Sequence, residues 1–463
     1  MDKRDLMQAH IRWLDQAREG DGPIYLRVVN ALGLAIEQGE LGPGDRLPPQ
    51  RVAADHLGVD LTTISRAYTQ ARELGLIEGA VGRGTFVRAN TGDEDLAGAI
   101  DLGMNVPPPV RGAPIGKRLS STLQEILASA DTAALMGYHV GPASPGQASL
   151  AQAWLRPCLG DVARGRLAVS AGAQSALHAI LTLLTRRGEA LLVEPLVYPG
   201  VLAVSRQLGL ILEPLPVDAH GVIPAGLEDL ARRTGAKVAY LCPTFQNPTG
   251  VTLDEARRRE IAVALERTGT SLIEDDAYGR LPAHPLHAVA RHAPARTWYI
   301  ATVAKTLSPG LRVAYVAAPT EATTERLVAA LRATALMPCP LTVALVSRWI
   351  RDGQAEAVLA DIRAEAMERR ALAAEILPAA SGGAESLHVW LDLPPGQDEA
   401  RIQAAARDKG LSLVASSAFC DGPTPRPGLR LSLGGARSQA SLSKALEETR
   451  RILEGDGRTR TIV

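Results

Sequence analysis

Apolar residues recur every three or four positions from Ile24 onward, and this period predicts an amphipathic helix that ends near Gly39. Two more helices are predicted over residues 50–57 and 61–75, separated by a Gly-Val-Asp turn. A hairpin of two short strands around a glycine-rich tip is predicted in LIEGAVGRGTFV. Three helices followed by a hairpin indicate a winged helix-turn-helix at the start of the chain.

We assign this head to residues 12–89, and a linker rich in glycine, proline and acidic residues to 90–115. Beyond the linker, helical stretches alternate with short apolar runs: LAVS, EALLVEP, KVAYLCP, SLIEDD and TWYIATV. Such alternation predicts an α/β fold whose mainly parallel sheet is covered on both faces. We expect this second domain over 116–463, with a large subdomain at about 116–320 and a smaller α+β subdomain at about 321–463.

Composition narrows the class of protein. The 463 residues are 46% apolar, enough for cores in two or three domains, and the formal net charge is zero. No apolar run approaches the roughly 20 residues of a membrane span, and the polar start is unlike a signal peptide. The four cysteines lack C-x-x-C spacing, which suits a reducing compartment. We therefore expect a cytoplasmic protein without a membrane partner or a bound metal.

The head presents residue types that contact nucleic acids. Hydroxyls at a helix N-terminus reach phosphates or base edges, and an arginine at a glycine-lined wing tip can enter a minor groove. We expect six DNA contacts: Arg51, Thr62, Thr63, Arg66, Arg83 and Gly84. Residues 1–90 nevertheless carry 11 Lys and Arg against 12 Asp and Glu, which leaves open a small helical bundle with solvated arginines.

The same region resembles a family of regulators. An arginine after L-P-x-x, a Thr-Thr pair opening the third helix, and G-R-G-T-F-V on the wing are similar to the DNA-binding half of GntR regulators. The resemblance implies a winged helix-turn-helix that binds operator DNA. Leu61 stands where that family usually has an arginine or asparagine, so the resemblance implies no base contact at this position.

One lysine, Lys305, lies between an apolar run and a Ser-Pro-Gly turn in IATVAKTLSPGLRVAYV. A lysine among apolar residues tends to lose its proton, because an unpaired buried ammonium is unfavourable. A lowered pKa is what a lysine that forms a Schiff base requires. Lys305 alone would be weak evidence, since a lysine at a strand end can also reach solvent.

Three motifs around this lysine, CPTFQNPTG, IEDDAYGRL and AKTLSPGLR, resemble those of fold-type I pyridoxal-phosphate enzymes, the aspartate aminotransferase superfamily, in order and spacing. The resemblance implies that Lys305 carries the cofactor aldehyde as an internal aldimine. It also implies that Asp275 keeps the pyridine nitrogen protonated, and that Asn247 and Tyr278 hydrogen-bond the 3-oxygen of the ring.

The resemblance extends to the cofactor's phosphate and to a carboxylate. Arg312 would supply a bidentate fork to the phosphate, and Arg430 in GLRLSL would bind an amino-acid carboxylate, with a solvated strand-edge arginine as the alternative. The other implied cofactor contacts are Gly172, Ala173 and Gln174 at a strand-to-helix turn, Thr302, Tyr198 stacked on the ring, and Tyr138 reaching the phosphate in a partner subunit. Taken singly, these residues also fit ordinary packing, capping or strand positions.

A winged helix-turn-helix ahead of an aminotransferase-like domain is the architecture of the MocR subgroup of GntR regulators. The resemblance implies a regulator, in a head-to-tail domain-swapped homodimer, that senses an amine or amino acid through an external aldimine at Lys305. Two alternatives stay open: a genuine pyridoxal-phosphate aminotransferase with an accessory DNA-binding head, and a repressor that lacks the cofactor. No residue selects the effector or distinguishes activation from repression.

Overall fold

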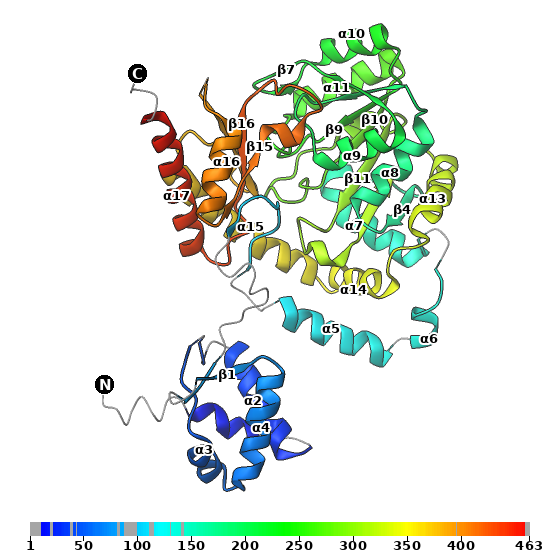
Figure 1. Ribbon diagram of the computed structural model, residues 1–463. Coiled ribbons are helices and arrows are strands. Elements are labelled where there is room, and N and C mark those ends of the chain that lie inside the picture. Colours follow the sequence, from blue (N-terminus) through cyan, green and yellow to red (C-terminus); the bar gives the residue numbers. More distant parts are fainter. Residues whose placement is uncertain are drawn as a thin grey trace. The chain divides into compact units, whose positions relative to one another are not determined.

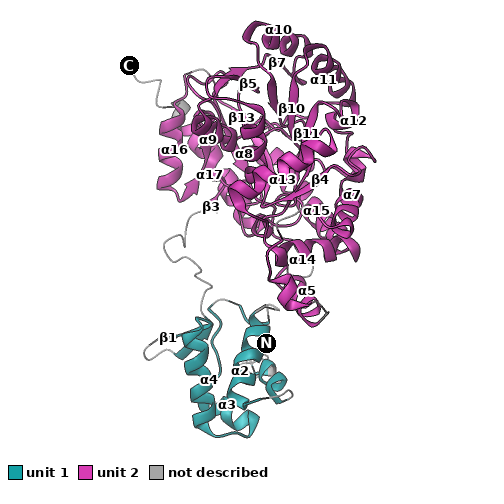
Figure 2. Ribbon diagram, turned by 90° about the vertical axis from the view of Figure 1, so that its right-hand side faces the viewer, with its two compact units in different colours: residues 1–98 teal, residues 99–463 magenta. Residues whose placement is uncertain are grey.

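The computed structural model describes residues 11–18, 22–37, 40–42, 44–80, 84–87, 100–110, 115–129, 131–139, 143–394 and 396–458. Arg83 of the predicted wing lies outside these residues. The chain divides into two compact units, residues 1–98 and 99–463 (Figure 2). Each unit has hydrophobic clusters of its own, so each is described separately.

The first unit contains the predicted helices and hairpin. Its elements are η1 (Arg12–Arg18), α2 (Ile24–Glu37), α3 (Gln50–Leu57), α4 (Leu61–Glu73), β1 (Ile77–Ala80) and β2 (Gly84–Val87). Gly58 ends α3 at a φ of 66°, a backbone conformation that favours glycine. Ile77 pairs with Val87 in the antiparallel hairpin. Buried Trp13, Leu32 and Ile64 pack the helices together, and the predicted winged helix-turn-helix is confirmed.

A seven-stranded sheet forms the centre of the second unit, in the order β4-β12-β11-β10-β9-β5-β6 (Figure 1). Its strands span Leu167–Ser170 (β4), Ala190–Val193 (β5), Ile211–Pro214 (β6), Val238–Leu241 (β9), Ser271–Asp275 (β10), Thr297–Thr302 (β11) and Ala314–Ala317 (β12). The neighbouring strands from β6 to β11 pair in parallel, whereas β12 is antiparallel to both of its neighbours. The mainly parallel sheet predicted from the apolar runs is therefore confirmed.

Helices cover both faces of this sheet. On one face are α8 (Ala173–Leu184), α9 (Pro199–Leu208) and α13 (Glu321–Ala335). On the other are α7 (Pro145–Leu159), α10 (Pro224–Thr234), α11 (Glu255–Thr268), α12 (Val289–His292), α14 (Pro340–Arg351) and α15 (Gln354–Ile376). Successive residues of β11 point to opposite faces of the sheet. Ile300 packs in the hydrophobic cluster with α8, α9 and α13, and Tyr299 packs in the large cluster with α7, α12, α14 and α15.

A third cluster surrounds a smaller sheet of order β13-β16-β15. Its elements are β13 (His388–Asp392), α16 (Glu399–Asp408), β14 (Leu411–Ser412), β15 (Val414–Ala415), β16 (Gly428–Ser432) and α17 (Gln439–Arg458), and β14 pairs with β3 (Ile100–Asp101). The long helix α15 joins both parts, because Ile362 packs in the large cluster and Ala373 in the third. The domain bounds expected from the sequence, including residue 321, remain predictions.

The remaining elements are the helix α5 (Ile115–Ser129) and the short elements α6 (Thr132–Leu135), β7 (Val217–Asp218), β8 (Gly221–Val222), η3 (Pro309–Leu311) and η4 (Ser416–Phe419). Helix α5 is fixed to α14 by a buried hydrogen bond, in which the indole N–H of Trp349 donates to Thr122 Oγ1 at 2.9 Å. Among the described residues, no helix is long and apolar enough to cross a membrane.

The Trp349–Thr122 hydrogen bond gives a test of the fold. Thr122→Val preserves the side-chain volume but leaves the buried indole N–H without its acceptor, so we expect the free energy of unfolding to fall by about 1–3 kcal/mol. Urea titration followed by near-ultraviolet circular dichroism measures the change. Ser120→Ala, at an exposed position of the same helix, is the control, and equal urea midpoints for the two variants would contradict the assignment.

Candidate functional site

A cavity of about 690 Å³ opens where the carboxyl ends of the central strands meet. Asp275 ends β10, Thr302 ends β11, and the turn after β4 leads into α8. Ligands of open α/β sheets bind at this edge. Most of the predicted cofactor and carboxylate residues line the cavity: Ala173, Gln174, Tyr198, Asn247, Asp275, Tyr278, Thr302, Lys305, Arg312 and Arg430.

Lys305 extends into the cavity from the loop after β11. Its Nζ donates a hydrogen bond to the backbone oxygen of Asn105. Burial lowers the pKa of Lys305 to about 8, and the positive charge of Arg430 adds to the effect. The amine is therefore partly neutral at physiological pH, as a nucleophile requires.

Asp275 carries one satisfied and one free carboxylate oxygen. Its Oδ2 accepts a hydrogen bond from Tyr240 on β9 at 2.8 Å, whereas its Oδ1 is buried without a partner. Burial raises the pKa of Asp275 to about 6. A buried acceptor without a partner is costly, so a ligand with a protonated ring nitrogen would satisfy it.

The start of α8 has the backbone and charge of a site that can hold an anion. Gly172 precedes the helix at a φ of 93°, and a Cβ there would lie 2.6 Å from Arg312 Nη2. Glycine is thus required both for the turn and for the close approach of this guanidinium. The first backbone N–H groups of α8, at Ala173 and Gln174, point outward at a helix N-terminus, which favours phosphate. The hydroxyl of Thr302 donates to the Val313 oxygen at 3.2 Å.

Tyr198 and Gln174 approach each other over Gly200. A Cβ at Gly200 would lie 2.2 Å from both Gln174 Oε1 and a ring carbon of Tyr198. Gln174 Nε2 donates to the Gly200 oxygen at 3.0 Å, and its Oε1 is buried without a partner. The Tyr198 ring is therefore held at the cavity wall, where a flat ligand can stack.

Arg430 is 6% exposed and does not lie on a solvated strand edge. Its Nη1 donates to Asn247 Oδ1 at 2.9 Å, and its Nη2 donates to the Gly103 oxygen. The guanidinium carbon lies 5.1 Å from the centre of the Phe419 ring, while Nε has no partner. Burial lowers the pKa of Arg430, and a carboxylate in the cavity would offset that loss of solvation.

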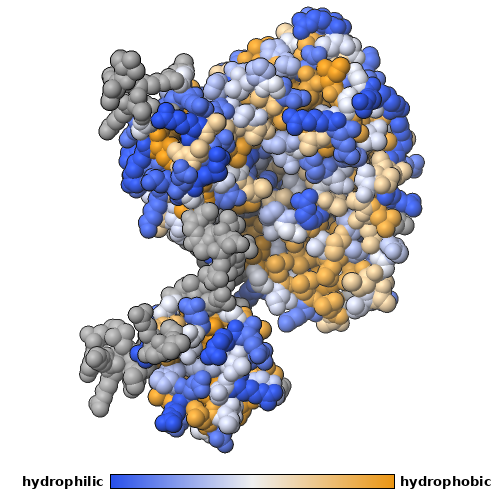
Figure 3. All heavy atoms as spheres, in the orientation of Figure 1, coloured by the Kyte–Doolittle hydropathy of each residue, from blue (hydrophilic) through white to orange (hydrophobic). Residues whose placement is uncertain are grey.

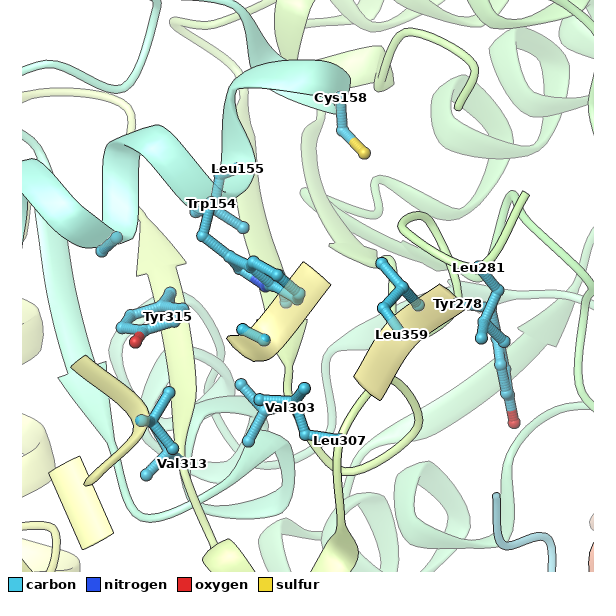
Figure 4. Packing of buried hydrophobic residues seen from close by; sticks show 14 of the residues in the cluster. Trp154, Leu155, Cys158, Tyr278, Leu281, Val303, Leu307, Val313, Tyr315 and Leu359 are labelled. Carbon is cyan, nitrogen blue, oxygen red and sulfur yellow. The ribbon is translucent and has the colours of Figure 1, made fainter. Parts of the chain in front are cut away.

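Tyr278 belongs to the large hydrophobic cluster, and in Figure 4 its hydroxyl points away from the labelled apolar side chains. Asn105 Nδ2 donates to this hydroxyl at 2.9 Å and to His388 Nδ1 at 3.0 Å. His388 Nε2 in turn donates to the Gln246 oxygen at 3.1 Å. Burial lowers the pKa of His388 to about 3, so the ring is neutral and its tautomer follows from these partners.

Three of these residues were not among the sequence candidates: Asn105, Tyr240 and His388. Tyr240 lies two residues before Cys242, on the strand that leads into CPTFQNPTG. Because residues two apart in a strand point to the same face of the sheet, the sequence could have indicated that Tyr240 and Cys242 share a face. Asn105 and His388 come from distant parts of the chain and offered no such spacing. They could be found only in the folded structure.

Other candidates lie away from the cavity. Tyr138 is 79% exposed and is not among the residues that line it. In the first unit, Arg51 is exposed on α3, and Thr62 and Thr63 occupy the first turn of α4. Gly84 opens β2 at a φ of 117°, beside the Arg46 guanidinium.

Arg66 of α4 is exposed and contacts α2. Its guanidinium carbon lies 4.0 Å from the centre of the Tyr25 ring, and Nη2 donates to the Tyr25 hydroxyl at 3.3 Å. The recognition helix thus presents an arginine that a neighbouring helix already holds.

Two family models match the chain. The model for bacterial regulatory proteins of the gntR family matches residues 24–87, and that for aminotransferase class I and II matches residues 101–447. The predicted combination of the two is confirmed.

Relatives and solved structures agree with these matches. The HTH-type transcriptional regulator YdeF of Bacillus subtilis is 28% identical, with 96% of this chain and 97% of the relative covered. The vitamin B6 salvage pathway transcriptional repressor PtsJ of Salmonella typhimurium is 27% identical, over 89% and 95%. The structure of the α-aminoadipate aminotransferase LysN of Thermus thermophilus superposes with a TM-score of 0.71 at 21% identity, over 85% and 99%. This last likeness shows the fold.

The lowered pKa of Lys305 predicts a pH-dependent stability. In cofactor-free protein the unfolded chain keeps the lysine proton up to about pH 10.5, whereas the folded chain loses it near pH 8. The unfolded state therefore binds more protons between these values, and the free energy of unfolding rises with pH through this window. Lys305→Met removes the rise and stabilises the cofactor-free protein at pH 7, on the order of 3 kcal/mol.

Urea titrations of the cofactor-free protein from pH 7 to pH 10.5 measure this effect. Lys237→Met, at an exposed lysine, is the control and should leave the pH dependence unchanged. A wild-type stability that is flat across the window, or that falls more steeply than in Lys305→Met, would contradict the assignment.

Proposed function

We propose that this chain, which belongs to the aminotransferase class I and II family, is a transcriptional regulator that senses an amine or amino-acid effector at Lys305. A gntR-family domain lies ahead of the aminotransferase domain, which is the architecture of MocR regulators. The observation that carries this proposal is the contact between Lys305 and Asn105. Asn105 lies in the stretch 90–115 assigned as the linker, in the part that belongs to the second unit. The sensing lysine thus contacts the part of the chain through which a signal to the head must pass.

The cofactor of this family is pyridoxal phosphate, and the cavity fits it. The unpartnered Asp275 Oδ1 would accept the proton of the ring nitrogen. Arg312 and the N-terminus of α8 would hold the phosphate, and Lys305 would carry the aldehyde carbon. When bound, the cofactor supplies an aldehyde that condenses with primary amines. Asn247 and Tyr278 would contact the oxygen on the ring.

The bound cofactor would let an effector amine take the place of the Lys305 amine. The freed lysine would then donate to the Asn105 oxygen, the contact seen in the structure. A carboxylate on the effector competes for the Arg430 guanidinium, whose Nη2 otherwise donates to the Gly103 oxygen. Both events change contacts of the segment Gly103–Asn105. An effector that favours one arrangement of this segment shifts the protein toward it.

Neighbouring contacts make the segment responsive as a unit. Ser432 N–H donates to the Leu102 oxygen at 2.7 Å, and Asp101 pairs with Ser412 across β3 and β14. A Cβ at Gly435, in the loop after β16, would lie 1.7 Å from the Asp101 oxygen, so this loop packs against β3 without spare space. A shift at Asn105 would therefore be transmitted through Asp101 and Leu102 to the smaller sheet.

The head supplies the DNA contacts in this proposal. Thr62 and Thr63 would bind phosphate or base edges from the first turn of α4, with Arg51 and Arg66 beside the groove. The wing residues Arg83 and Gly84 would enter a minor groove. Such a regulator acts where the chromosome lies, in the cytoplasm.

An exposed apolar surface supports a homodimer. Met136 is 68% and Tyr138 79% exposed, and Leu127 and Leu336 are also exposed. Figure 3 shows hydrophobic residues gathered on the part of the second unit where α5, α6 and α14 lie. Apolar surface of this kind favours association. We therefore include a head-to-tail, domain-swapped dimer, in which Tyr138 reaches the partner subunit's phosphate site, in the proposal.

A genuine aminotransferase with an accessory head is the second candidate. It is favoured by the completeness of the cavity, which brings Lys305, Asp275 and Arg430 together. An electrophoretic shift assay separates the two candidates. Absence of any specific binding to the DNA upstream of the protein's own gene, together with turnover of amino donors, would favour the enzyme.

Operator binding gives the first test of the head. We expect Arg51→Ala to weaken the affinity and to reduce the slope of log affinity against log salt by about 0.9, because one phosphate contact is lost. Fluorescence anisotropy with the upstream DNA at several salt concentrations measures both quantities. Arg233→Ala, at an exposed arginine of α10, is the control. Identical salt slopes for Arg51→Ala and wild type would exclude this contact.

The effector response tests the sensor. We expect Lys305→Ala to lose the visible absorbance of the lysine-bound cofactor and to bind operator DNA without responding to any amine. Asn105→Ala keeps the backbone oxygen but removes the side-chain hydrogen bonds to Tyr278 and His388 that fix this segment. It should therefore keep that absorbance yet lose most of the response, which in wild type should be about 5- to 150-fold in DNA affinity. A panel of amines and amino acids, titrated by absorbance and anisotropy, provides the measurement.

Lys409→Ala, at an exposed lysine, is the control for both signals. If wild type supplied with pyridoxal phosphate lacked the absorbance band, a repressor without cofactor would replace our proposal. If Asn105→Ala responded like wild type, the sensor would stand but its route through the Gly103–Asn105 segment would not.

A further inference from the structure

Three potential metal ligands converge outside the cavity, at one end of α11 and α12. Glu255 is the first residue of α11, His287 precedes α12, and His292 is the last residue of α12. Their ligand atoms, one from each side chain, all lie within 4.8 Å of one another. All three side chains are partly buried.

The separations between these atoms are too long for good hydrogen bonds. His292 Nε2 lies 3.6 Å from Glu255 Oε2, and His287 Nδ1 lies 3.4 Å from Glu255 Oε1. His292 Nε2 and Glu255 Oε2 are both buried, and neither has a hydrogen-bond partner among the described residues. Two polar atoms thus face each other, shielded from water, without satisfying each other. Native structures leave few such groups unexplained.

A small cation between the three side chains would account for this spacing. Zinc binds imidazole nitrogen and carboxylate oxygen at about 2.0–2.2 Å, which in a tetrahedron separates the ligand atoms by about 3.4 Å. The separation of 3.6 Å between His292 Nε2 and Glu255 Oε2 is close to this value, and one ligand atom from each of the three side chains lies within 4.8 Å of the others. From this geometry we propose that Glu255, His287 and His292 bind one zinc ion, with water in the fourth position.

The carboxylate is already oriented for this role. Glu255 Oε1 accepts the backbone N–H of His287 at 2.6 Å, which directs Oε2 toward His292. Two imidazoles and one carboxylate are a ligand set that zinc favours over calcium or magnesium, which prefer oxygen. The sequence predicted no metal site, because Glu255 is remote from the histidines along the chain and two histidines alone have no diagnostic spacing.

Two nearby arginines oppose binding. Arg258 Nη1 donates to the His287 oxygen at 3.3 Å, so a buried guanidinium lies close to the cation, and the positive charge of Arg259 also acts on His292. The single negative charge of Glu255 offsets only part of this. We therefore expect micromolar affinity, with zinc holding the segment before α12 against the start of α11. Since the site requires the folded arrangement, zinc should raise the unfolding temperature.

Calorimetric titration of the untagged full chain with zinc chloride tests this site. The Cys339→Ser background removes an exposed thiol that could bind the ion. We expect one zinc per chain, with the affinity weakened about tenfold or more in His292→Ala and in Glu255→Gln. His292→Cys, which retains a zinc ligand, should bind more tightly than His292→Ala. Cobalt added in place of zinc should give the visible absorbance of a tetrahedral site.

His284→Ala, at an exposed histidine of the same region, is the matched control and should bind zinc like the parent. Retention of the cofactor's absorbance in each variant shows that the second unit is folded. The proposal is overturned if the parent binds no zinc. It is also overturned if His292→Ala and Glu255→Gln bind as tightly as His284→Ala.

Discussion

The hydrogen bond from Lys305 to the Asn105 oxygen is the interaction on which the second unit's organisation depends. A lysine amine in a largely apolar cavity needs a partner, because its desolvation is only partly offset by Asp275. The available partner is a backbone carbonyl of the segment that enters this unit from the head. The buried guanidinium of Arg430 likewise donates a hydrogen bond to a backbone oxygen, that of Gly103. The backbone of Gly103–Asn105 thus accepts hydrogen bonds from two buried cationic side chains. A ligand that supplies an aldehyde or a carboxylate competes with these backbone oxygens for Lys305 and Arg430.

The long helix α15 sets how such competition can spread. Its first part packs in the large cluster through Ile362, and Ala373 belongs to the smaller one. Between them, Arg369 pairs with Glu365 at 2.8 Å and donates to the Leu433 and Ala436 oxygens. This buried pair fixes the helix to the loop after β16. The smaller sheet is therefore held to the second half of α15.

Much of this arrangement was predictable where local pattern and chemistry coincide. The runs LAVS and SLIEDD are strands because both faces of the sheet are buried, and Asp275 reaches the cavity because it ends such a run. The helices of the head followed from apolar spacing and from Gly58. The antiparallel direction of β12 was not predictable, because its residues are as uniformly buried as those of a parallel strand.

What the pattern could not reveal are contacts between residues that only the fold brings together. The His388–Asn105–Tyr278 network joins a strand of the smaller sheet, the entry segment and the loop after β10. No spacing along the chain encodes such a network, and a buried neutral histidine has the same sequence signature as one in an ordinary core. Glu255, His287 and His292 converge for the same reason, through the packing of α11 on α12. These contacts depend on tertiary packing.

The contact of Arg66 with Tyr25 has a consequence for how the head meets DNA. A free arginine on a recognition helix samples many rotamers and must give up that freedom when it reaches a base or a phosphate, a loss of about 1–2 kcal/mol. Here the ring restricts the guanidinium before any encounter, so part of that entropy is already lost in the unbound protein. In the proposed contact of Arg66 with DNA, selectivity would then reflect how well a DNA site accepts a prearranged side chain rather than how readily the side chain adapts to the site.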